Sequence, residues 1–346
     1  MSNSENNQVQ WKSPAGKYWK ELSAICSAKR STKPSAKCSA ESWDDLVQIH
    51  DWLKNRTESA NQERESSPVF IFRGQGPHGD LKTSIERAFE EFEIDGNERP
   101  KFEKQLIRSF QRKAPYHLKG VGVPTLDNTL EWLSLMQNHG APTRLLDWTY
   151  SFYRALYNAI SKSSRSRKDK LWESELWVMN TRWFTNKTEN KMRESINKAP
   201  QSTEEERERM EELLNFLDNA KEEVKDYKGL LANNRSKMVQ YLMGEEPLPL
   251  VYNVTPIGLN ERIIYQQGTF VLPGDITKCF MQNLEPYKKN NCKDHLFRIA
   301  IKLEHQGRNR IIEELNDMNI NEAVLFPGLD GFARSLWMEL AFLHKR

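Results

Sequence analysis

The chain of 346 residues has few cysteines, and their arrangement argues against a bound metal. No CxxC pair occurs among the four, which are Cys26, Cys38, Cys279 and Cys292. The seven histidines do not fall at HExxH or other metal-ligand spacing. We therefore expect no structural zinc and no other metal.

Long apolar runs are also missing. No uninterrupted apolar stretch is long enough to cross a bilayer, and the first twenty residues lack the apolar core of a secretory signal. We therefore expect a cytoplasmic protein with reduced thiols and no membrane partner. The formal charge of +3 is too small to indicate nucleic-acid binding by the molecule as a whole, so any such signal must be local.

Several catalytic signatures are absent as well. The Gly-Gln-Gly at 74–76 is too short for a phosphate-binding loop and is not followed by GK[ST]. The sequence has no GxSxG motif, no cysteine in a catalytic context and no DxD-type acidic cluster. These absences disfavour an ATPase, a hydrolase and a metal-dependent nuclease.

The first 40 residues are rich in polar and basic side chains. Residues 11–40 contain seven Lys and Arg against one acid, Glu21, and Trp11, Tyr18 and Trp19 lie among them. Cations neutralise phosphates and aromatic faces stack on bases, so this segment suits nucleic-acid binding. A solvated basic tail, or a contact surface for an antitoxin or other partner protein, is the alternative. We expect residues 1–40 to be loosely ordered.

Residues 41–346 contain enough apolar material for a large core, since 38% of the whole chain is hydrophobic. Helical periodicity occurs at 42–55, 84–117, 129–140, 151–160, 310–318 and 331–343. Strand formers occur at 67–76, 143–149, 174–180, 248–254, 262–272 and 295–303. Because these do not alternate as βαβ units, we predict an α+β fold, with a mixed or antiparallel sheet flanked by helices. Charges of both signs at i,i+4 spacing predict a helical insertion at 186–249.

Two stretches carry polar groups that a buried segment should not need. They are "VFIFRGQG" at 69–76 and "NHGAPTRLLDWTYSFYRALYNAI" at 138–160. The mismatch raises the question of whether Arg73, His139, Arg144 and Asp147 line one site.

These stretches also carry a family resemblance. The chain resembles the FRG-domain family of bacterial and phage proteins, named for the tripeptide that stands here at 72–74. The other matching blocks are "QNHGAPTRLLDWT" with the following "ALYNA", "RIIYQQGTF" and "NEAVLFPGLDG". Together they cover about 68–160 and 250–335 and leave the basic segment and the insertion unmatched.

A second resemblance is to ADP-ribosyltransferases. In that family an Arg or His on a first strand grips NAD, a Ser/Thr-containing strand leads into a helix, and a Glu or a substitute follows on a later strand. "FIFRG", "LLDWTYSFYRALYNA" and "ERIIYQQGTFVL" are similar to these elements in that order. The third block offers Glu261, Gln266 and Gln267 in place of the family carboxylate. The resemblance implies an ADP-ribosyltransferase-like fold and an NAD-consuming toxin or anti-phage effector; a non-catalytic FRG binding module is the alternative.

Transfer of ADP-ribose requires a cation for the pyrophosphate, groups that orient the ribose, and a base on the acceptor side. Arg73 meets the first need, because a guanidinium at a strand end beside glycines can bind phosphate oxygens with two donors. An internal ion pair with Asp147 is the alternative. His139 could contact the ribose or act as a base, or it could only interact with a helix C-terminus.

The remaining candidates carry similar alternatives. A carboxylate in "LLDWT" needs a partner, so we expect Asp147 to pair with Arg144 or to cap the next helix, with catalysis as the alternative. Gln266 and Gln267 lie in the predicted strand 262–272, so one of them should face inward and orient a substrate. Glu322 is a candidate for the missing acid or a capping residue.

These considerations define two groups of candidates. The candidate catalytic residues are Arg73, His139, Asp147, Gln267 and Glu322. The candidate NAD-binding residues are Arg73, Gly74, Gln75, Thr143, Arg144, Thr149 and Gln266. We expect the acceptor to be RNA or another nucleic acid, with protein as the alternative, because five Lys and Arg against one acid at 161–170 add to the basic segment. An antitoxin or chaperone is a further expected partner.

Overall fold

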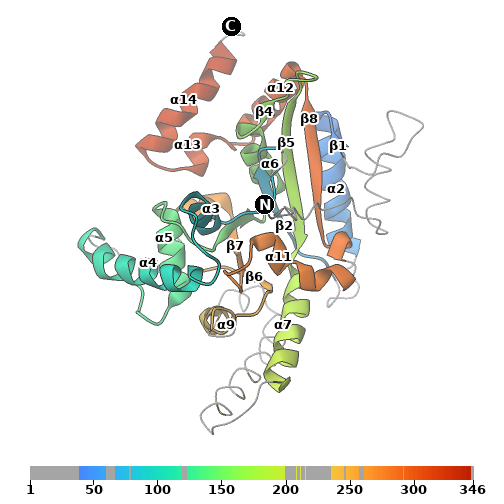
Figure 1. The fold of residues 1–346 in the computed structure, drawn as a ribbon. Helices are drawn as coiled ribbons and strands as arrows, with labels where there is room; N and C mark the ends of the chain where they lie inside the picture. The colour runs from blue at the N-terminus through green and yellow to red at the C-terminus, as the bar shows by residue number, and fades with distance from the viewer. Residues whose placement is uncertain are drawn as a thin grey trace, which may run out of the picture.

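The computed structural model describes residues 39–59, 67–77, 79–118, 123–198, 208, 211, 215, 235–244, 247–256, 261–290 and 292–343 (Figure 1). Most of the predicted basic segment and the middle of the predicted insertion lie outside these residues. The described ends of the insertion region belong to two helices, α7 (Thr181–Lys198) and α9 (Arg235–Leu242).

One eight-stranded sheet organises the described residues, in the order β1-β8-β5-β2-β3-β7-β6, with β4 paired to β5. Its strands are β1 (Ser39–Ala40), β2 (Phe70–Gln75), β3 (Leu146–Thr149), β4 (Ser164–Arg165), β5 (Trp172–Asn180), β6 (Val251–Val254), β7 (Gly268–Pro273) and β8 (Leu296–Leu303). β1 runs parallel to β8, and the other pairs are antiparallel. The predicted mixed sheet flanked by helices is confirmed, and it begins at Ser39.

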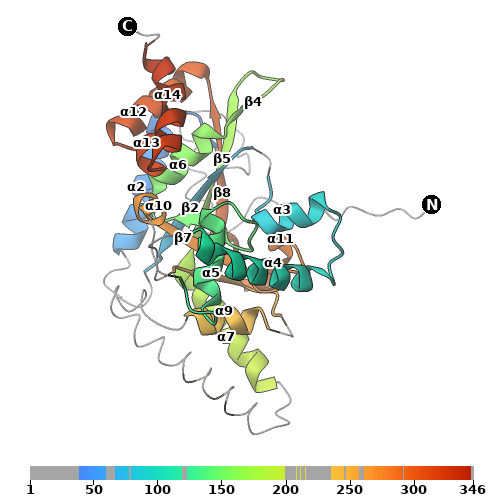
Figure 2. The same ribbon diagram turned by 90° about the vertical axis from the view of Figure 1, so that its left-hand side faces the viewer.

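Helices cover both faces of this sheet (Figure 2). The side of α2 (Trp43–Ser59), α6 (Phe152–Ser161) and α12 (His305–Asp317) contains one apolar core. The other side contains a second core, to which α4 (Arg99–Lys113), α5 (Thr129–Asn138), α7, α9 and α11 (Phe280–Asn283) contribute. α3 (Ser84–Glu91) packs with Ile276 in a smaller cluster. The remaining helices are α10 (Glu261–Gln266), α13 (Glu322–Leu325), α14 (Leu329–Leu343) and the 3₁₀ turns Ala114–Tyr116, Glu285–Asn290 and Cys292–Asp294.

Capping residues explain where several helices begin. The side chains of Ser42, Thr83, Asn128 and Ser151 each accept a hydrogen bond from a backbone N–H three residues later. α5 ends before Gly140, whose φ of +79° is accessible to glycine at little energetic cost. The predicted helices and strands around the two polar stretches therefore begin and end near their expected positions.

The predicted strand at 262–272 is wrong in its first half. Glu261–Gln266 form α10, and β7 begins only at Gly268. Gln267 joins them with a φ of +47°. The end of β3 stabilises this turn, because the Thr149 hydroxyl donates to the Gln266 carbonyl at 2.6 Å and the Tyr150 N–H donates to the Gln267 carbonyl at 3.0 Å. The prediction that strand alternation turns Gln266 or Gln267 inward is therefore wrong, since neither residue lies in a strand.

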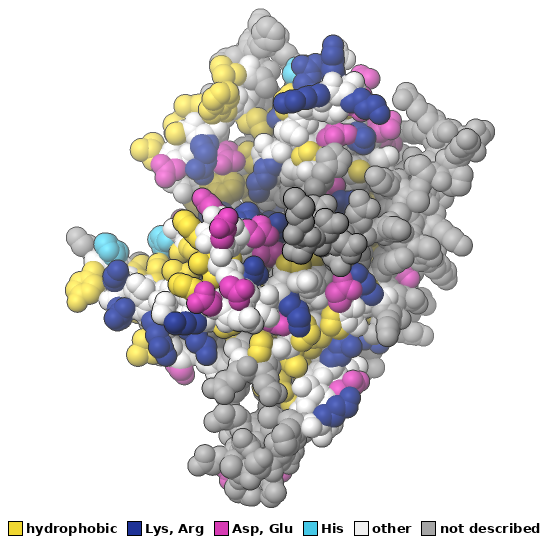
Figure 3. Space-filling model, in the orientation of Figure 1, with side chains coloured by type: hydrophobic (Ala, Val, Ile, Leu, Met, Phe, Trp, Pro, Cys, Tyr) yellow, Lys and Arg dark blue, Asp and Glu magenta, His cyan; other side chains and the backbone are white. Residues whose placement is uncertain are grey.

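The helix predicted at 331–343 exists as part of α14, but the large apolar side chains described at its helical spacing are exposed. Phe332, Leu336 and Leu340 of α14 are exposed, together with Leu329 and Trp337. Figure 3 shows hydrophobic side chains over α14 at the upper left of the molecule. The apolar periodicity predicted this helix correctly, but periodicity does not indicate whether another part of the protein packs against its apolar side.

No described helix is both long enough and apolar enough to span a bilayer.

Candidate functional site

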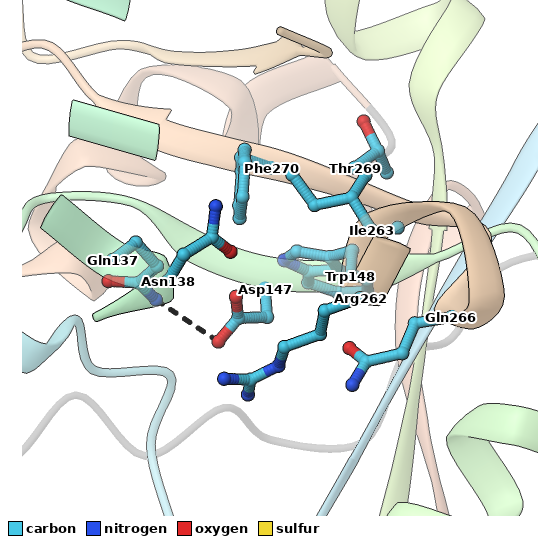
Figure 4. Close-up of a pocket in the computed structure, with 10 residues that line it drawn as sticks. Gln137, Asn138, Asp147, Trp148, Arg262, Ile263, Gln266, Thr269 and Phe270 are labelled. Carbon is cyan, nitrogen blue, oxygen red and sulfur yellow. Dashed lines mark hydrogen bonds between the residues drawn. The ribbon is translucent and has the colours of Figure 1, made fainter. Parts of the chain in front are cut away.

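Three neighbouring strands, β2, β3 and β7, bring together the segments that carry most of the candidates. Phe72 of β2 pairs with Thr149 of β3, and Asp147 of β3 pairs with Phe270 of β7. Residues 77 and 123 positions apart in the sequence thus become adjacent. α5 and α10 approach the same part of the sheet (Figure 4).

A pocket lies where α5, β3, α10 and β7 meet. It contains about 360 Å³ of empty space, part of which is open to solvent. The residues that line it are Gln137, Asn138, Asp147, Trp148, Arg262, Ile263, Gln266, Gly268, Thr269 and Phe270. Figure 4 shows Gln137 and Asn138 on one side, Arg262 and Gln266 on the other, and Asp147 and Trp148 between them. Of the predicted site residues, the pocket therefore includes Asp147 and Gln266.

Asp147 is exposed, and a neighbouring glutamine orients its carboxylate. Gln137 Nε2 donates to Asp147 Oδ2 at 3.1 Å, and the Thr143 hydroxyl donates to Gln137 Oε1 at 2.6 Å. Thr143 is fully buried, so the structure places it behind Gln137 and not in the pocket. The predicted partner of Asp147, Arg144, is not the observed one.

Arg73 lies beside Asp147 but forms its hydrogen bond with the backbone. Its Nη1 donates to the Asp147 carbonyl oxygen at 2.7 Å, whereas its buried Nε has no partner within the described part of the chain. Burial lowers the pKa of Arg73; the charge of Asp147 opposes this shift, and Arg87 adds to it. The predicted pair with Asp147 is thus a backbone hydrogen bond combined with a charge interaction at longer range.

Lys162 is a further cation that lies within electrostatic range of Asp147. Loss of hydration lowers the pKa of Lys162, the C-cap of α6, with Arg73, Arg262 and Arg87 acting in the same direction and Asp147 opposing them. The side chain of Lys162 is exposed as a whole, so we attribute part of this shift to the neighbouring positive charges. Arg73, Arg87, Arg262 and Asp147 therefore all lie within electrostatic range of Lys162. We call the four cations, beside the pocket that Arg262 and Asp147 line, the cationic cleft.

Sequence reasoning missed three members of the cationic cleft. Arg87 lies on α3, Lys162 ends α6 and Arg262 begins α10, so only the fold brings them together. Lys162 lies within the basic run 161–170, and Arg262 lies in "RIIYQQGTF". Nothing in their local sequence indicated a shared site.

Arg144 was a candidate NAD-binding residue, but the structure gives it a structural role instead. Its side chain is 3% exposed and forms a salt bridge with Glu103 of α4. Arg144 Nε donates to Glu103 Oε1 at 2.8 Å, and Nη1 donates to the Pro273 and Gly274 carbonyls at 3.0 and 2.7 Å. A buried arginine needs such partners, and α4 supplies the acid that the local sequence around 144 lacked. Arg144 does not contribute to the pocket.

Four of the five predicted catalytic residues are not among those that line the pocket. One is Arg73, described above, and the others are His139, Gln267 and Glu322. His139 is exposed at the C-terminus of α5, and Gln267 is exposed in the turn after α10. Glu322 begins α13, where it accepts a hydrogen bond from the Tyr157 hydroxyl at 3.0 Å and pairs with Arg334 at 2.9 Å. Burial raises the pKa of Tyr157, and the charge of Glu322 adds to the shift.

The remaining candidates position neighbouring elements. A Cβ on Gly74 would lie 1.9 Å from the Ala155 carbonyl oxygen, so this glycine lets α6 cross β2 at close range. Gln75 Nε2 donates to the Gly79 carbonyl at 2.6 Å, and Thr149 holds the end of α10 as described above. Gln266 Nε2 donates to the Leu325 carbonyl at 3.1 Å, which connects the pocket to α13.

The described residues contain no cluster of His, Cys, Asp or Glu that could hold a metal ion. The groups suited to an anionic ligand are instead Arg73, Arg87, Lys162 and Arg262, since Arg and Lys side chains donate to phosphate oxygens. Gln137 and Gln266 can orient a neutral part of the same ligand.

Comparison with known proteins gives one family match. No curated protein and no solved structure matches the chain. Residues 68–169 match the model of the FRG domain, a segment that runs from just before β2 to just before β5. The similarity to the FRG domain covers this segment, which contains Arg73, Arg87, Asp147 and Lys162.

Proposed function

We propose that this chain binds NAD in the cationic cleft and transfers its ADP-ribose group to a nucleic acid, with RNA as the favoured acceptor. The observation that carries the proposal is the gathering of Arg73, Arg87 and Arg262 within electrostatic range of Lys162, next to Asp147. A pyrophosphate carries negative charge that such a group of cations would stabilise. The pocket beside it offers the amides of Gln137, Asn138 and Gln266 to the rest of the cofactor.

The reaction needs few protein groups. The bond between the ribose C1′ and the nicotinamide nitrogen breaks, nicotinamide leaves with the bonding electron pair, and a nucleophile of the acceptor forms the new bond to C1′. Asp147 accepts the proton that the acceptor loses. It is suited to this because it is exposed and because Gln137 fixes one of its carboxylate oxygens at 3.1 Å.

Strand order also supports the proposal. The three blocks that resemble ADP-ribosyltransferase elements lie on or beside the adjacent strands β2, β3 and β7. The third block supplies Gln266 to the pocket instead of a carboxylate. In our proposal Asp147, from the second block, takes the role of the missing acid.

RNA is the favoured acceptor because further positive charge lies outside the cationic cleft. Basic residues of the run 161–170 lie at the turn that joins β4 to β5, directly after Lys162. Figure 3 shows Lys and Arg side chains grouped at the top of the molecule, where this turn lies in Figure 1. A phosphate backbone that contacts this surface would reach the cleft through Lys162. Such an enzyme would act as an intracellular toxin or anti-phage effector, controlled by an antitoxin or chaperone.

A second candidate function is a non-catalytic FRG module that binds a phosphorylated ligand. It is favoured by the structural roles of Thr143, Arg144 and Thr149 and by the position of Glu322 outside the pocket lining. Under this alternative the cationic cleft binds its ligand without turnover.

The test is incubation of the purified chain with NAD labelled in its adenylate half, with separate pools of RNA, DNA and protein. We expect label in RNA and release of nicotinamide. Asp147→Asn should abolish transfer and retain NAD binding, whereas Arg73→Lys should weaken binding, because a point charge lacks the two-donor geometry of a guanidinium. Binding of NAD without label in any pool and without nicotinamide release would support the binding module. Label in protein alone would refute the RNA acceptor and retain the transferase.

A further inference from the structure

Trp148 carries a buried hydrogen-bond donor that the protein itself does not use. The residue is 3% exposed, and its Nε1 has no partner within the described part of the chain. Buried polar groups in folded proteins are nearly always paired, so an unpaired one indicates a missing partner. An indole N–H can only donate, so the missing partner is an acceptor.

The direction of this donor places the acceptor in the pocket. Trp148 lines the pocket, and Figure 4 shows the nitrogen end of its indole pointing toward Asn138 and Phe270, which also line it. Phe270 and Ile263 supply apolar surface, as a flat ring requires.

Charge in the lining indicates that this part of the ligand is neutral. Among the described residues that line the pocket, Arg262 is cationic and Asp147 is anionic, so the lining has no net charge. The other members of the cationic cleft, Arg73, Arg87 and Lys162, are not part of the lining. An anion is therefore favoured beside the pocket and not within it.

The other polar groups define the rest of the ligand. Asp147 Oδ2 is held by Gln137, whereas Oδ1 has no hydrogen-bond partner among the described residues and can accept from a ligand N–H. Asn138 offers both a donor and an acceptor. A carbonyl oxygen next to an N–H group would satisfy Trp148 and Asp147 together.

We propose that this pocket is a subsite for a planar, uncharged carboxamide or lactam, whose carbonyl oxygen accepts from Trp148 Nε1–H and whose N–H donates to Asp147. The group belongs either to the nicotinamide of NAD or to a nucleobase of the acceptor. This choice between sources rests on the proposed function, whereas binding of the group itself does not require turnover.

The test measures binding of small probes to the purified full-length chain, without NAD and without an acceptor, by ¹H–¹⁵N spectra of the tryptophan indoles. Benzamide should bind and move one indole resonance downfield. Benzoate, which is charged, and acetophenone, which has no N–H, should bind more weakly. Nicotinamide and guanosine distinguish the two sources, with adenosine as a base that has no carbonyl.

Trp148→Phe keeps an aromatic ring and removes the donor, so it should weaken benzamide binding roughly tenfold, which is the effect of one lost hydrogen bond to a buried group. Trp177→Phe is the matched control. Trp177 is 2% exposed, its Nε1 is also unpaired within the described residues, and it is not among the residues lining the pocket. This variant should bind benzamide like the wild type.

Four results would overturn the subsite. The first two are no binding of any amide probe and benzoate binding as tightly as benzamide. The third is an equal loss of benzamide affinity in Trp148→Phe and Trp177→Phe. The fourth is an unmoved Trp148 indole resonance, which would mean that the partner of this N–H is only a water molecule. If Trp148→Phe does not fold, the wild-type indole shift still decides. Absence of ADP-ribose transfer in the separate labelling experiment would leave this binding result unaffected.

Discussion

Gly74 shows how a single residue fixes the geometry beside the site. A Cβ at this position would lie 1.9 Å from the Ala155 carbonyl oxygen and 2.4 Å from the Ala159 nitrogen, and both of these atoms belong to the backbone of α6. Neither atom can move without displacing the helix. α6 ends at the C-cap Lys162, so the glycine also determines where that cation lies.

We predict that Gly74→Ala destabilises the protein by about 3 kcal/mol or more, because overpacking against a helix backbone cannot relax locally. Gly76→Ala is the control: its Cβ would lie 3.1 Å from the Lys162 carbonyl oxygen, so about 1 kcal/mol or less is expected. Urea denaturation of both variants measures the difference. Similar stabilities for the two would contradict this account of the Phe-Arg-Gly tripeptide.

The buried pair of Arg144 and Glu103 leads to a prediction about stability. Glu103→Leu should cost about 3–5 kcal/mol, because it leaves a buried guanidinium without its counter-charge. Glu103→Leu combined with Arg144→Met should be more stable than the single variant, since both charges are then removed. Thermal unfolding of the two proteins provides the comparison. A double variant that is less stable than the single would show that the bonds from Arg144 to the Pro273 and Gly274 carbonyls dominate.

His295 predicts a loss of stability in acid. Burial, with help from Lys187 and Arg56, lowers its pKa from 6.5 to about 4. Its ring stacks on Trp183 at 4.3 Å, and its Nδ1 lies 3.2 Å from Asn180 Nδ2. The unfolded chain therefore binds a proton more readily than the folded one between these two pH values. The stability contributed by neutral His295 is complete above about pH 6.5 and is lost as the pH falls toward 4.

After allowance for the partial exposure of the ring, we expect a loss of about 1–2 kcal/mol from this group. His295→Gln cannot titrate and keeps an acceptor for Asn180, so its unfolding free energy should fall less steeply over the same pH range. Urea denaturation at several pH values measures both slopes. Identical slopes would mean that other groups account for the acid dependence.

At the scale of elements, the sequence predicted the helices whose ends carry a capping residue or a terminating glycine. Ser151, Asn128 and Gly140 lie at the boundaries of α6 and α5, where caps and a glycine stop can be recognised in the sequence. The segment 262–272 contains no such signal at its centre. Its division into α10 and β7 depends on hydrogen bonds from Thr149 and Tyr150, more than 100 residues earlier in the chain. A window of eleven residues does not contain that information.

The last two helices differ in how firmly they belong to the fold. α13 contributes Leu325, which is 1% exposed. The centre of the Phe326 ring, which follows α13, lies 5.0 Å from the guanidinium carbon of Arg262 and 5.4 Å from that of Arg334. α14 exposes much of its apolar surface and is connected to α13 by the pair of Arg334 and Glu322.

We therefore predict that truncation after Pro327, which removes α14, lowers the thermal midpoint by only a few degrees, equivalent to about 1 kcal/mol. Binding of a hydrophobic dye should fall, because exposed apolar side chains are lost. Truncation after Ile320 also removes α13, Leu325 and the contact with Arg262, so it should be far more damaging. A large loss of stability after the first truncation would show that α14 packs more firmly than its exposure indicates.

At the scale of the whole molecule, the site depends on contacts between distant parts of the sequence. Sequence reasoning selected Arg73 and Asp147 because they interrupt apolar segments, and the fold places them together. It could not find Arg87 or Arg262, because a surface arginine on a helix has the same local pattern wherever the helix packs. It assigned Arg144 to the cofactor because the buried acid on α4 lies about 40 residues away.

The last prediction concerns how the whole molecule would engage RNA. The cationic cleft, the exposed turn after Lys162 and the basic segment 11–40 are separate sources of positive charge. If all three contact one backbone, log Kd should rise with log salt concentration by roughly 0.7 for each phosphate neutralised on a single strand. A single strand should bind better than a duplex, because a base must leave its stack to reach the cleft.

Charge reversals separate the contributions. Changing Arg165, Arg167 and Lys168 to Glu should reduce the salt slope and weaken RNA binding while leaving binding of free NAD unchanged, because none of the three is a member of the cationic cleft or of the pocket lining. Lys12, Lys17 and Lys20 changed to Glu test the basic segment in the same way. Filter binding of labelled single-stranded and duplex RNA across a salt series gives the slopes. If neither set of reversals alters the salt slope, these two surfaces do not belong to the acceptor interface. RNA would then contact the protein through the cationic cleft alone.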